Sequence, residues 1–437
     1  MSNWKKLQIG KAISFNPPES IKKGKIVKKI PMGSLTEYQR KINSFEFSVY
    51  NNGPKFRNGD TIMAKITPCL ENGKTAFVDI LEDEEIAFGS SEYIVLRETV
   101  HTTPLFVYYL AISPTFRKRA ISCMEGTSGR KRVSEKTLKY FELDFPQINT
   151  QKTIAKVLSD LDAKIEVNNK INAELEAMAK TLYDYWFVQF NFPCPEGLEG
   201  QEHLAGKPYK SSDGLMVYNE ALKREIPVGW GDGSLLDIAN FQNGLACQKF
   251  RPIDENFLPV IKIKDMRDGF TSKTEKVRID VPDKIKIYDG DILFSWSASL
   301  EVMIWSGGNG ALNQHIFKVT SDNFPKSYYY FEVLNYLQHF KMIADLRKTT
   351  MGHITQDHLK QSRISIPPID LCKKLNKKLE PILKSVVSNR QQNRKLSELR
   401  DWLLPMLMNG QVTVGEAKKQ VDNLGMVAES DVKYGKG

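Results

Sequence analysis

The chain of 437 residues contains a long internal repeat, and this repeat constrains its fold more than any other feature. Between residues 154 and 182, apolar or Asn residues recur at alternating steps of four and three, and adding 221 to each position leads to a second series of the same character. Only one pair, Ala179 and Arg400, changes chemical class, so chance does not easily explain the match. The first series is Ile154, Leu158, Leu161, Ile165, Asn168, Asn172, Leu175, Ala179 and Leu182, and the second is Leu375, Leu379, Ile382, Val386, Asn389, Asn393, Leu396, Arg400 and Leu403.

This spacing predicts two long helices that pair with each other. Apolar residues at alternating steps of three and four form the seam of a coiled coil. Each segment of about 40 residues predicts a helix about 60 Å long. Asn at a seam position lowers stability but fixes register and orientation. Because both helices carry the same two Asn residues, we predict a symmetric antiparallel pair with the Asn layers near its centre; two ordinary core helices are the simpler alternative.

The segments that precede the two helices also repeat. Gly-Asp turns are followed by strand-like sequence in both halves, and a Gly-bearing loop, a short helix and a strand ending at Pro come later in both. Each half therefore predicts an α+β domain of about 140 residues before its helix. The matching stretches are "FRNGDTIMAKITP" (56–68) with "IYDGDILFSWSAS" (287–299), "GSSEYIVLR" (89–97) with "LNQHIFKVT" (312–320), and residues 126–146 with 349–368.

The predicted fold class is α+β, with two repeated α+β domains separated by two long helices that form an antiparallel coiled coil. The predicted boundaries are a first α+β domain at 1–148, a first long helix at 149–190, a connector at 191–228, a second α+β domain at 229–368, a second long helix at 369–412 and a flexible tail at 413–437.

Composition indicates a basic protein of the cytoplasm. The net charge of +10 arises from 62 Lys and Arg against 52 Asp and Glu, which favours binding to polyanions such as nucleic acid, although a merely basic protein has the same balance. No apolar run is long enough to cross a membrane, and the first residues lack the apolar core of a signal peptide. The five cysteines lie far apart, which argues against a zinc site or a disulfide framework.

Motifs for catalysis are incomplete. Asn16-Pro17-Pro18 resembles the catalytic loop of amino-group DNA methyltransferases, but Glu19 follows where an aromatic residue is needed, and no Gly-rich cofactor turn is found. We therefore predict a rigid surface turn. Pro282-Asp283 lacks the Glu-x-Lys of a nuclease, and neither a phosphate-binding loop nor an HExxH motif occurs. The sequence predicts no catalytic residue and no metal site.

Several stretches resemble the specificity subunit, HsdS, of type I restriction-modification systems. These are "KTLYDYWFVQFNF", "GKPYKSSDGLMVYNEALKREIPVGW", "LSELRDWLLPMLMNGQV" (396–412), "NGDTIMAKITPCLENGKTAFV" and "GDILFSWSASLEV" with "NQHIFKV". The resemblance covers nearly the whole chain. It implies that the α+β domains are target recognition domains, each reading one half of a bipartite, asymmetric site in double-stranded DNA. It also implies that the helices set the spacing and dock two methyltransferase subunits, and through them restriction subunits.

The resemblance implies no cofactor for this chain itself. S-adenosylmethionine belongs to the partner methyltransferase, and ATP and Mg belong to a partner restriction subunit. Two other classes of function are weighed against it: a self-sufficient methyltransferase or nuclease, and a coiled-coil scaffold that binds only protein partners.

DNA contacts are expected from basic and amide side chains in the two domains. The strongest candidate is a loop with three consecutive basic residues beside Gly, although such a run is also typical of a solvated surface. Its residues are Ser128, Gly129, Arg130, Lys131 and Arg132, followed in the first domain by Lys65, Thr67, Lys74, Ser90 and Ser91. The second domain contributes Ser295, Trp296, Ser297, Asn313, Gln314, His315, Gly352 and His353. For partner subunits, or alternatively for packing within the chain, the candidates are Tyr183, Tyr185, Trp186, Phe187 and Trp402.

Overall fold

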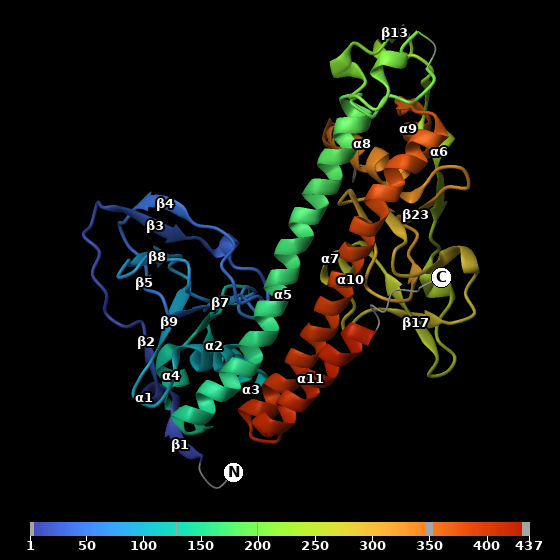
Figure 1. Ribbon diagram of the computed structural model, residues 1–437. Helices are drawn as coiled ribbons and strands as arrows, with labels where there is room; N and C mark the ends of the chain where they lie inside the picture. The colour runs from blue at the N-terminus through green and yellow to red at the C-terminus, as the bar shows by residue number, and fades with distance from the viewer. Residues whose placement is uncertain (1–3, 128, 199, 347–352, 431–437) are drawn as a thin grey trace. The chain divides into compact units, whose positions relative to one another are not determined.

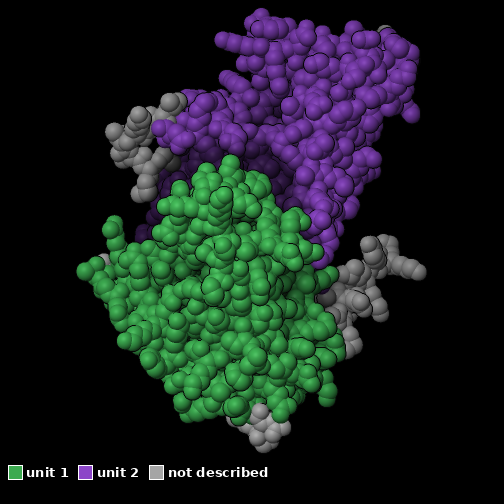
Figure 2. Space-filling view, turned by 90° about the vertical axis from the view of Figure 1, so that its left-hand side faces the viewer, with its two compact units in different colours: residues 1–166, 395–437 green, residues 167–394 purple. Residues whose placement is uncertain are grey.

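The protein is described from a computed structural model that covers residues 4–127, 129–198, 200–346 and 353–430. The chain divides into two compact units, coloured separately in Figure 2: unit 1 comprises residues 1–166 and 395–437, and unit 2 comprises residues 167–394.

Unit 1 is built on two four-stranded sheets and two short strand pairs. The first sheet has the order β2-β9-β6-β7 and the second β4-β3-β8-β5; all pairings are antiparallel except β3 with β8. The strands are β2 (Ile13–Phe15), β9 (Tyr93–Glu98), β6 (Thr61–Ala64), β7 (Thr75–Phe77), β4 (Glu46–Val49), β3 (Ile26–Ile30), β8 (Ala87–Gly89) and β5 (Lys55–Phe56). The pairs are β1 (Lys5–Gln8) with β12 (Glu142–Phe145), and β10 (Met124–Glu125) with β11 (Arg132–Val133).

Unit 2 repeats both four-stranded sheets and the pairing of β1 with β12. Its sheets have the orders β16-β23-β20-β21 and β18-β17-β22-β19, and the β17–β22 pair is parallel, as β3–β8 is in unit 1. The strands are β16 (Asn240–Asn243), β23 (Ile316–Thr320), β20 (Ile292–Ser295), β21 (Glu301–Ile304), β18 (Lys276–Arg278), β17 (Phe257–Ile261), β22 (Gly310–Leu312), β19 (Lys286–Ile287), and the pair β15 (Gly231–Gly233) with β24 (Ile364–Ile366). The prediction of two repeated α+β domains is confirmed.

Helices of varied length accompany the sheets in both units. Unit 1 has α1 (Ile9–Ala12), η1 (Met32–Ser34), α2 (Pro104–Ile112), α3 (Pro114–Ser122), α4 (Glu135–Tyr140) and α11 (Val414–Ser430). Unit 2 has α6 (Leu235–Ile238), η5 (Cys247–Lys249), α7 (Ile263–Asp268), η6 (Asp283–Ile285), α8 (Lys326–Leu346) and α9 (Gln356–Gln361), and its connector contains η3 (Glu202–Leu204), η4 (Lys210–Ser212) and the hairpin β13 (Met216–Asn219) with β14 (Arg224–Pro227).

Two long helices contribute to both units. The first is α5 (Ile148–Tyr183), which continues into one π-helical turn, η2 (Asp184–Val188), and the second is α10 (Ile369–Met408). Their apolar seam positions are largely buried in the hydrophobic core of each unit. In unit 1 these are Ile154, Leu158, Leu161, Leu396 and Leu403, with Ile165 at the margin; in unit 2 they are Leu375 and Leu379, with Leu182 and Ile382 at the margin. Val386 is buried and Leu175 is half-buried.

Within unit 2, α5 and α10 run side by side in opposite directions (Figure 1), and their seam Asn residues meet. Asn168 donates from Nδ2 to Oδ1 of Asn393 at 2.8 Å, and Asn389 donates to Oδ1 of Asn172 at 2.9 Å. Asn172 in turn donates to the carbonyl oxygen of Val386 at 3.3 Å. Each amide thus finds a partner in the opposite helix, as a buried polar seam requires. The antiparallel pairing and the paired Asn layers are confirmed.

The chain after Gly410 differs from the predicted loose tail. Residues Val414–Ser430 form α11, and Ala417 is fully buried in the core of unit 1. Thr413 and Glu416 form reciprocal hydrogen bonds of 2.8 Å and 3.3 Å at its N-terminus, which satisfy backbone donors that a helix start leaves open. The flexible-tail prediction is therefore wrong for 414–430, while residues 431–437 lie outside the described part.

Among the described residues, no helix is both long and apolar enough to cross a membrane.

Candidate nucleic-acid interface

The candidate DNA-binding residues of unit 1 gather where three loops meet. They are the loop that follows β6, the turn before β9 and the loop between β10 and β11. The backbone N–H of Lys65 donates to the carbonyl oxygen of Glu92 at 2.9 Å, and that of Val133 donates to Lys65 at 2.9 Å. The N–H of Thr67 donates to Lys131 at 3.0 Å. Main-chain hydrogen bonds thereby hold segments some 30 to 70 residues apart in the sequence side by side.

An ion pair lies at this junction. Arg132 donates from Nε to Glu92 Oε2 at 2.9 Å and from Nη2 to Glu92 Oε1 at 2.8 Å. The Arg132 side chain is 49% exposed and that of Glu92 is 24% exposed. The hydrogen bonds from Arg132 hold the pKa of Glu92 below its usual value, so the pair is ionised at neutral pH. The predicted DNA contact Arg132 is therefore already held by a carboxylate that sequence reasoning missed.

The other candidates of unit 1 surround this pair with varied exposure. Gly129, Arg130 and Lys131 are exposed, and Gly129 has φ +82°, a left-handed conformation that suits Gly at the loop tip. Lys74 donates to the carbonyl oxygen of Met32 at 3.2 Å, so its ammonium is engaged within the domain.

Three further candidates have smaller side chains. Ser90 accepts from the N–H of Glu92 at 3.3 Å, Ser91 is exposed, and the Thr67 hydroxyl is buried. Ser128 lies outside the described residues.

Unit 2 builds the same junction from different side chains. The N–H of Trp296 donates to the carbonyl oxygen of His315 at 3.3 Å, and the N–H of Ile354 donates to Trp296 at 2.9 Å. These bonds match those of Lys65 with Glu92 and of Val133 with Lys65. Trp296, His315 and His353 therefore take the places of Lys65, Glu92 and Arg132.

The side chains at the unit 2 junction form an aromatic cluster. The Trp296 ring lies 5.6 Å from His315 and 5.5 Å from His353, measured between centroids. The indole Nε1 donates to Oδ1 of Asn243 at 2.9 Å, which fixes the plane of the ring. Gln314 is exposed and lies 3.3 Å from the His315 ring. An ion pair in one unit is thus replaced in the other by aromatic rings in tilted and edge-to-face contact.

The structure corrects three predictions in unit 2. Ser295, Ser297 and Asn313 are only 0%, 4% and 6% exposed, so their side chains are not presented at the surface. Ser295 donates to the carbonyl oxygen of Ser299, and Asn313 accepts from the N–H of His315 at 3.4 Å, which makes both of them supports for the loops. Gly352 lies outside the described residues.

The Asn16-Pro17-Pro18 turn is a structural element, as predicted. Asn16 has φ 49°, and its Nδ2 donates to both carboxylate oxygens of Glu135 at 2.9 Å. Its Oδ1 accepts from the N–H of Val95 at 2.9 Å, so the amide that a methyltransferase would use on a base is fully occupied.

The aromatic residues predicted for partner binding divide into two groups. Tyr183, Trp186 and Phe187 are buried in the core of unit 2, which bears out the alternative that they pack within the chain. Tyr185 is 37% exposed in unit 2, and Trp402 is 45% exposed in unit 1.

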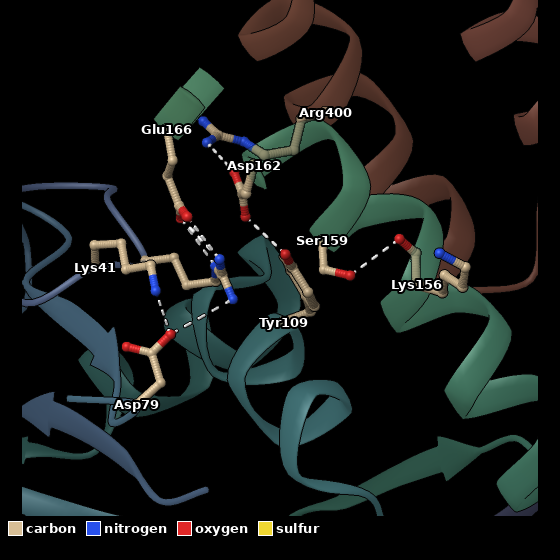
Figure 3. Close-up of polar contacts among 9 residues, drawn as sticks. Lys41, Asp79, Tyr109, Lys156, Ser159, Asp162, Glu166 and Arg400 are labelled. Carbon is tan, nitrogen blue, oxygen red and sulfur yellow. Dashed lines mark hydrogen bonds and ion pairs between the residues drawn. The ribbon is translucent and has the colours of Figure 1, made fainter. Parts of the chain in front are cut away.

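The α+β domain of unit 1 is attached to both long helices through polar groups with little exposure (Figure 3). Tyr109 of α2 donates to Oδ2 of Asp162 on α5 at 2.7 Å, and Arg400 on α10 donates to Oδ1 of the same carboxylate at 2.8 Å. Arg40 donates to both oxygens of Glu166 on α5, at 2.8 Å to 3.1 Å. The domain that carries the interface is therefore anchored on a charged network that sequence reasoning missed.

No group of three or more metal-ligating side chains is present among the described residues.

Comparison with known proteins identifies the family. The family model "Type I restriction modification DNA specificity domain" matches residues 3–177 and 227–398. The specificity subunit of the type I restriction enzyme MjaIX from Methanocaldococcus jannaschii is 26% identical over 320 residues, which cover 71% of this chain and 69% of the relative. The HindI specificity subunit from Haemophilus influenzae is 24% identical over 403 residues, covering 82% and 87%.

A solved structure shares the fold. The S subunit of a type I restriction-modification system from M. genitalium superposes with a TM-score of 0.53 at 15% identity, covering 93% of this chain and 96% of that one. The two matches of the family model fall on the two repeated halves, and together they span most of the chain. The chain belongs to the family of type I restriction-modification specificity subunits.

Proposed function

We propose that this chain is the DNA-sequence-recognition subunit of a type I restriction-modification complex and has no catalytic activity of its own. Each α+β domain reads one half of a bipartite, asymmetric site, and the paired helices set the separation of the half-sites. DNA and partner subunits are the ligands, in keeping with a basic chain of net charge +10.

One observation carries this proposal. The same main-chain junction is built twice, with Lys65, Glu92 and Arg132 in unit 1 and with Trp296, His315 and His353 in unit 2. For a scaffold that binds only protein, we do not expect the same main-chain framework to recur with different side chains lining it. Two readers with one framework and different chemistry are what an asymmetric site requires, because base edges are distinguished by side-chain donors, acceptors and apolar groups.

The long helices supply the rest of the assembly. We propose that they dock two methyltransferase subunits, for which the exposed Tyr185 and Trp402 offer aromatic anchors. S-adenosylmethionine would be bound by those methyltransferase subunits, and ATP and Mg by restriction subunits where these are present. The complex would act in the cytoplasm.

A methylation map tests the proposal. The chain is co-expressed with the methyltransferase subunit of its system in a host free of DNA methylation, with the methyltransferase alone as the control. We expect a bipartite methylated motif only when this chain is present. A soluble complex that leaves the DNA unmethylated, or the same motif with the methyltransferase alone, would contradict the proposed function.

A further inference from the structure

We propose that Arg132 and Glu92 form a guanine-reading pair, in which Arg132 contacts the base and Glu92 positions it. This inference rests on the proposed function and deepens it, because it assigns one base to one junction. The pair lies at the meeting point of the three loops of unit 1, with the Arg132 side chain half-exposed.

The hydrogen bonds of Arg132 to Glu92 leave one edge of its guanidinium group free to bind a base. A guanidinium has a side edge, formed by Nε and Nη2, and an end edge, formed by Nη1 and Nη2. Glu92 accepts from Nε and Nη2 and therefore occupies the side edge. The end edge remains available for a second bidentate partner. Guanine presents the adjacent acceptors O6 and N7 in the major groove, whereas adenine and cytosine present an amino donor there.

The local charge also favours a base over a phosphate. Glu92 neutralises Arg132 at short range, which weakens its attraction to a phosphate but leaves its directional hydrogen bonds intact. Arg130 and Lys131 lie beside it on the same loop, are exposed and form no ion pair within the described residues. These two are suited to phosphates, while Arg132 is suited to a specific acceptor pair.

The ion pair between Arg132 and Glu92 is not needed to hold the β10–β11 loop in place. The β10–β11 loop is already tied to the end of β6 by the main-chain bonds of Thr67 and Val133. Unit 2 retains the equivalent bond between Ile354 and Trp296, and His315 and His353 replace the two charged residues, so no ion pair is found at the described part of this junction. Arg132 and Glu92 thus occur together in unit 1, and both are replaced in unit 2. This is expected if the role of the carboxylate is to position the guanidinium.

The test uses 7-deazaguanine, which lacks the N7 acceptor. Duplexes are made on the motif found by methylation mapping, each with one guanine replaced, and their affinities for the complex with the methyltransferase subunit are measured. For the wild type we expect one guanine, in one half-site, whose replacement weakens binding by about 5- to 150-fold. For Arg132→Gln, replacing the same guanine should not weaken binding further. Replacements in the other half-site should change the affinity of this variant as much as they change that of the wild type.

A second variant separates positioning from contact. Glu92→Gln keeps the shape of the side chain and removes its charge, so we expect a smaller loss of discrimination at the same guanine. Glu46→Gln is the matched control, because Glu46 pairs with Lys29 at 2.7 Å across strands β3 and β4 of the same unit and makes none of the main-chain bonds that form the junction.

The outcomes distinguish the two proposals. If a motif is found but no guanine is sensitive, or if Arg132→Gln and wild type lose the same affinity at the sensitive guanine, the assignment of Arg132 is wrong and the proposed function stands. If the wild type yields no motif, both are overturned. The unfolding midpoint of each variant checks that the domain is intact.

Discussion

Arg400 is a charged residue at a helix position that is apolar in the other unit. Its guanidinium is 13% exposed and its partner Asp162 is 5% exposed, so the pair is removed from water. By the internal repeat, Arg400 corresponds to Ala179 and Asp162 to Leu383, both of which belong to the apolar core of unit 2. The same helix position is therefore ionic in one unit and apolar in the other.

This comparison predicts the result of removing the pair. Arg400→Ala leaves the Asp162 carboxylate buried without its counter-charge, and we expect a loss of about 3 to 5 kcal/mol in the free energy of unfolding of unit 1. The double variant Arg400→Ala with Asp162→Leu reproduces the residues of unit 2 and should recover part of that loss, because it removes the unpaired charge but leaves the Tyr109 hydroxyl without its acceptor. Urea unfolding measures both variants; a double variant no more stable than Arg400→Ala would contradict this explanation.

Glu332 in unit 2 predicts a pH dependence of stability. Burial raises the pKa of Glu332 from 4.5 to about 7, although the hydrogen bond from Tyr183 acts in the opposite direction. The folded state therefore holds a proton that the unfolded state releases near pH 4.5, and stability falls as pH rises from about 5 to about 7.

Glu332→Gln removes this titration. We expect the variant to exceed the wild type by on the order of 3 kcal/mol at pH 8, since each pKa unit corresponds to about 1.4 kcal/mol, and to match it near pH 4. Glu380→Gln is the control, because Glu380 is paired with Lys384 at the surface and should show no gain at pH 8. Equal pH profiles for wild type and Glu332→Gln would disprove the assignment.

At the scale of elements, α11 completes the core of unit 1. Ala417 is fully buried, and Val412, Val414 and Val421 pack against the same hydrophobic cluster. Ala417→Glu places an unpaired carboxylate in that cluster, so we expect α11 to undock and the unfolding free energy of unit 1 to fall by more than about 2 kcal/mol. Lys418→Glu, at the exposed neighbouring position, should leave stability unchanged. Limited proteolysis of residues 414–430 reports undocking; equal protection of the two variants would show that the helix does not depend on this contact.

The sequence predicted elements best where a pattern repeats. The seam series predicted α5, α10 and the Asn pairs, because the helix period carries that information locally. The Gly-Asp turns and the strands after them likewise appear in both units. The end of α10 and the start of α11 were misjudged, although Thr413 and Glu416 have the spacing of a capping box and could have indicated a helix.

The candidate site was predictable only in part. Lys65, Arg132, Trp296 and His353 are among the predicted DNA contacts, and each lies at a junction of its unit. Glu92 was missed, because its role depends on which distant loop lies beside it.

The wrong choices share a different cause. Ser295 and Asn313 have suitable chemistry, but the direction of a side chain at a strand end depends on the backbone of the fold. Residue type alone does not distinguish a base contact from a support of the loop.

At the scale of the whole molecule, the net charge of +10 predicts DNA binding that weakens steeply with salt. Arg130→Gln and Lys131→Gln should each reduce the slope of log affinity against log salt by about 1 and leave the methylated motif unchanged, since phosphate contacts carry no sequence information. Lys6→Gln, which removes an exposed charge on β1, is the control and should leave the slope as it is. A changed motif in the first two variants would mean that these residues read bases.

The Asn layers have a consequence for how such a chain can arise. Asn168 pairs with Asn393, which is the repeat copy of Asn172, and Asn172 pairs with Asn389, which is the repeat copy of Asn168. An interface in which residue i meets the copy of j, and j meets the copy of i, is isologous, as in a twofold homodimer. Two identical half-length chains, each with one recognition domain and one helix, would satisfy the same amides by dimerising. Joining two such halves by gene duplication preserves these Asn pairs, and it leaves each recognition domain free to diverge on its own.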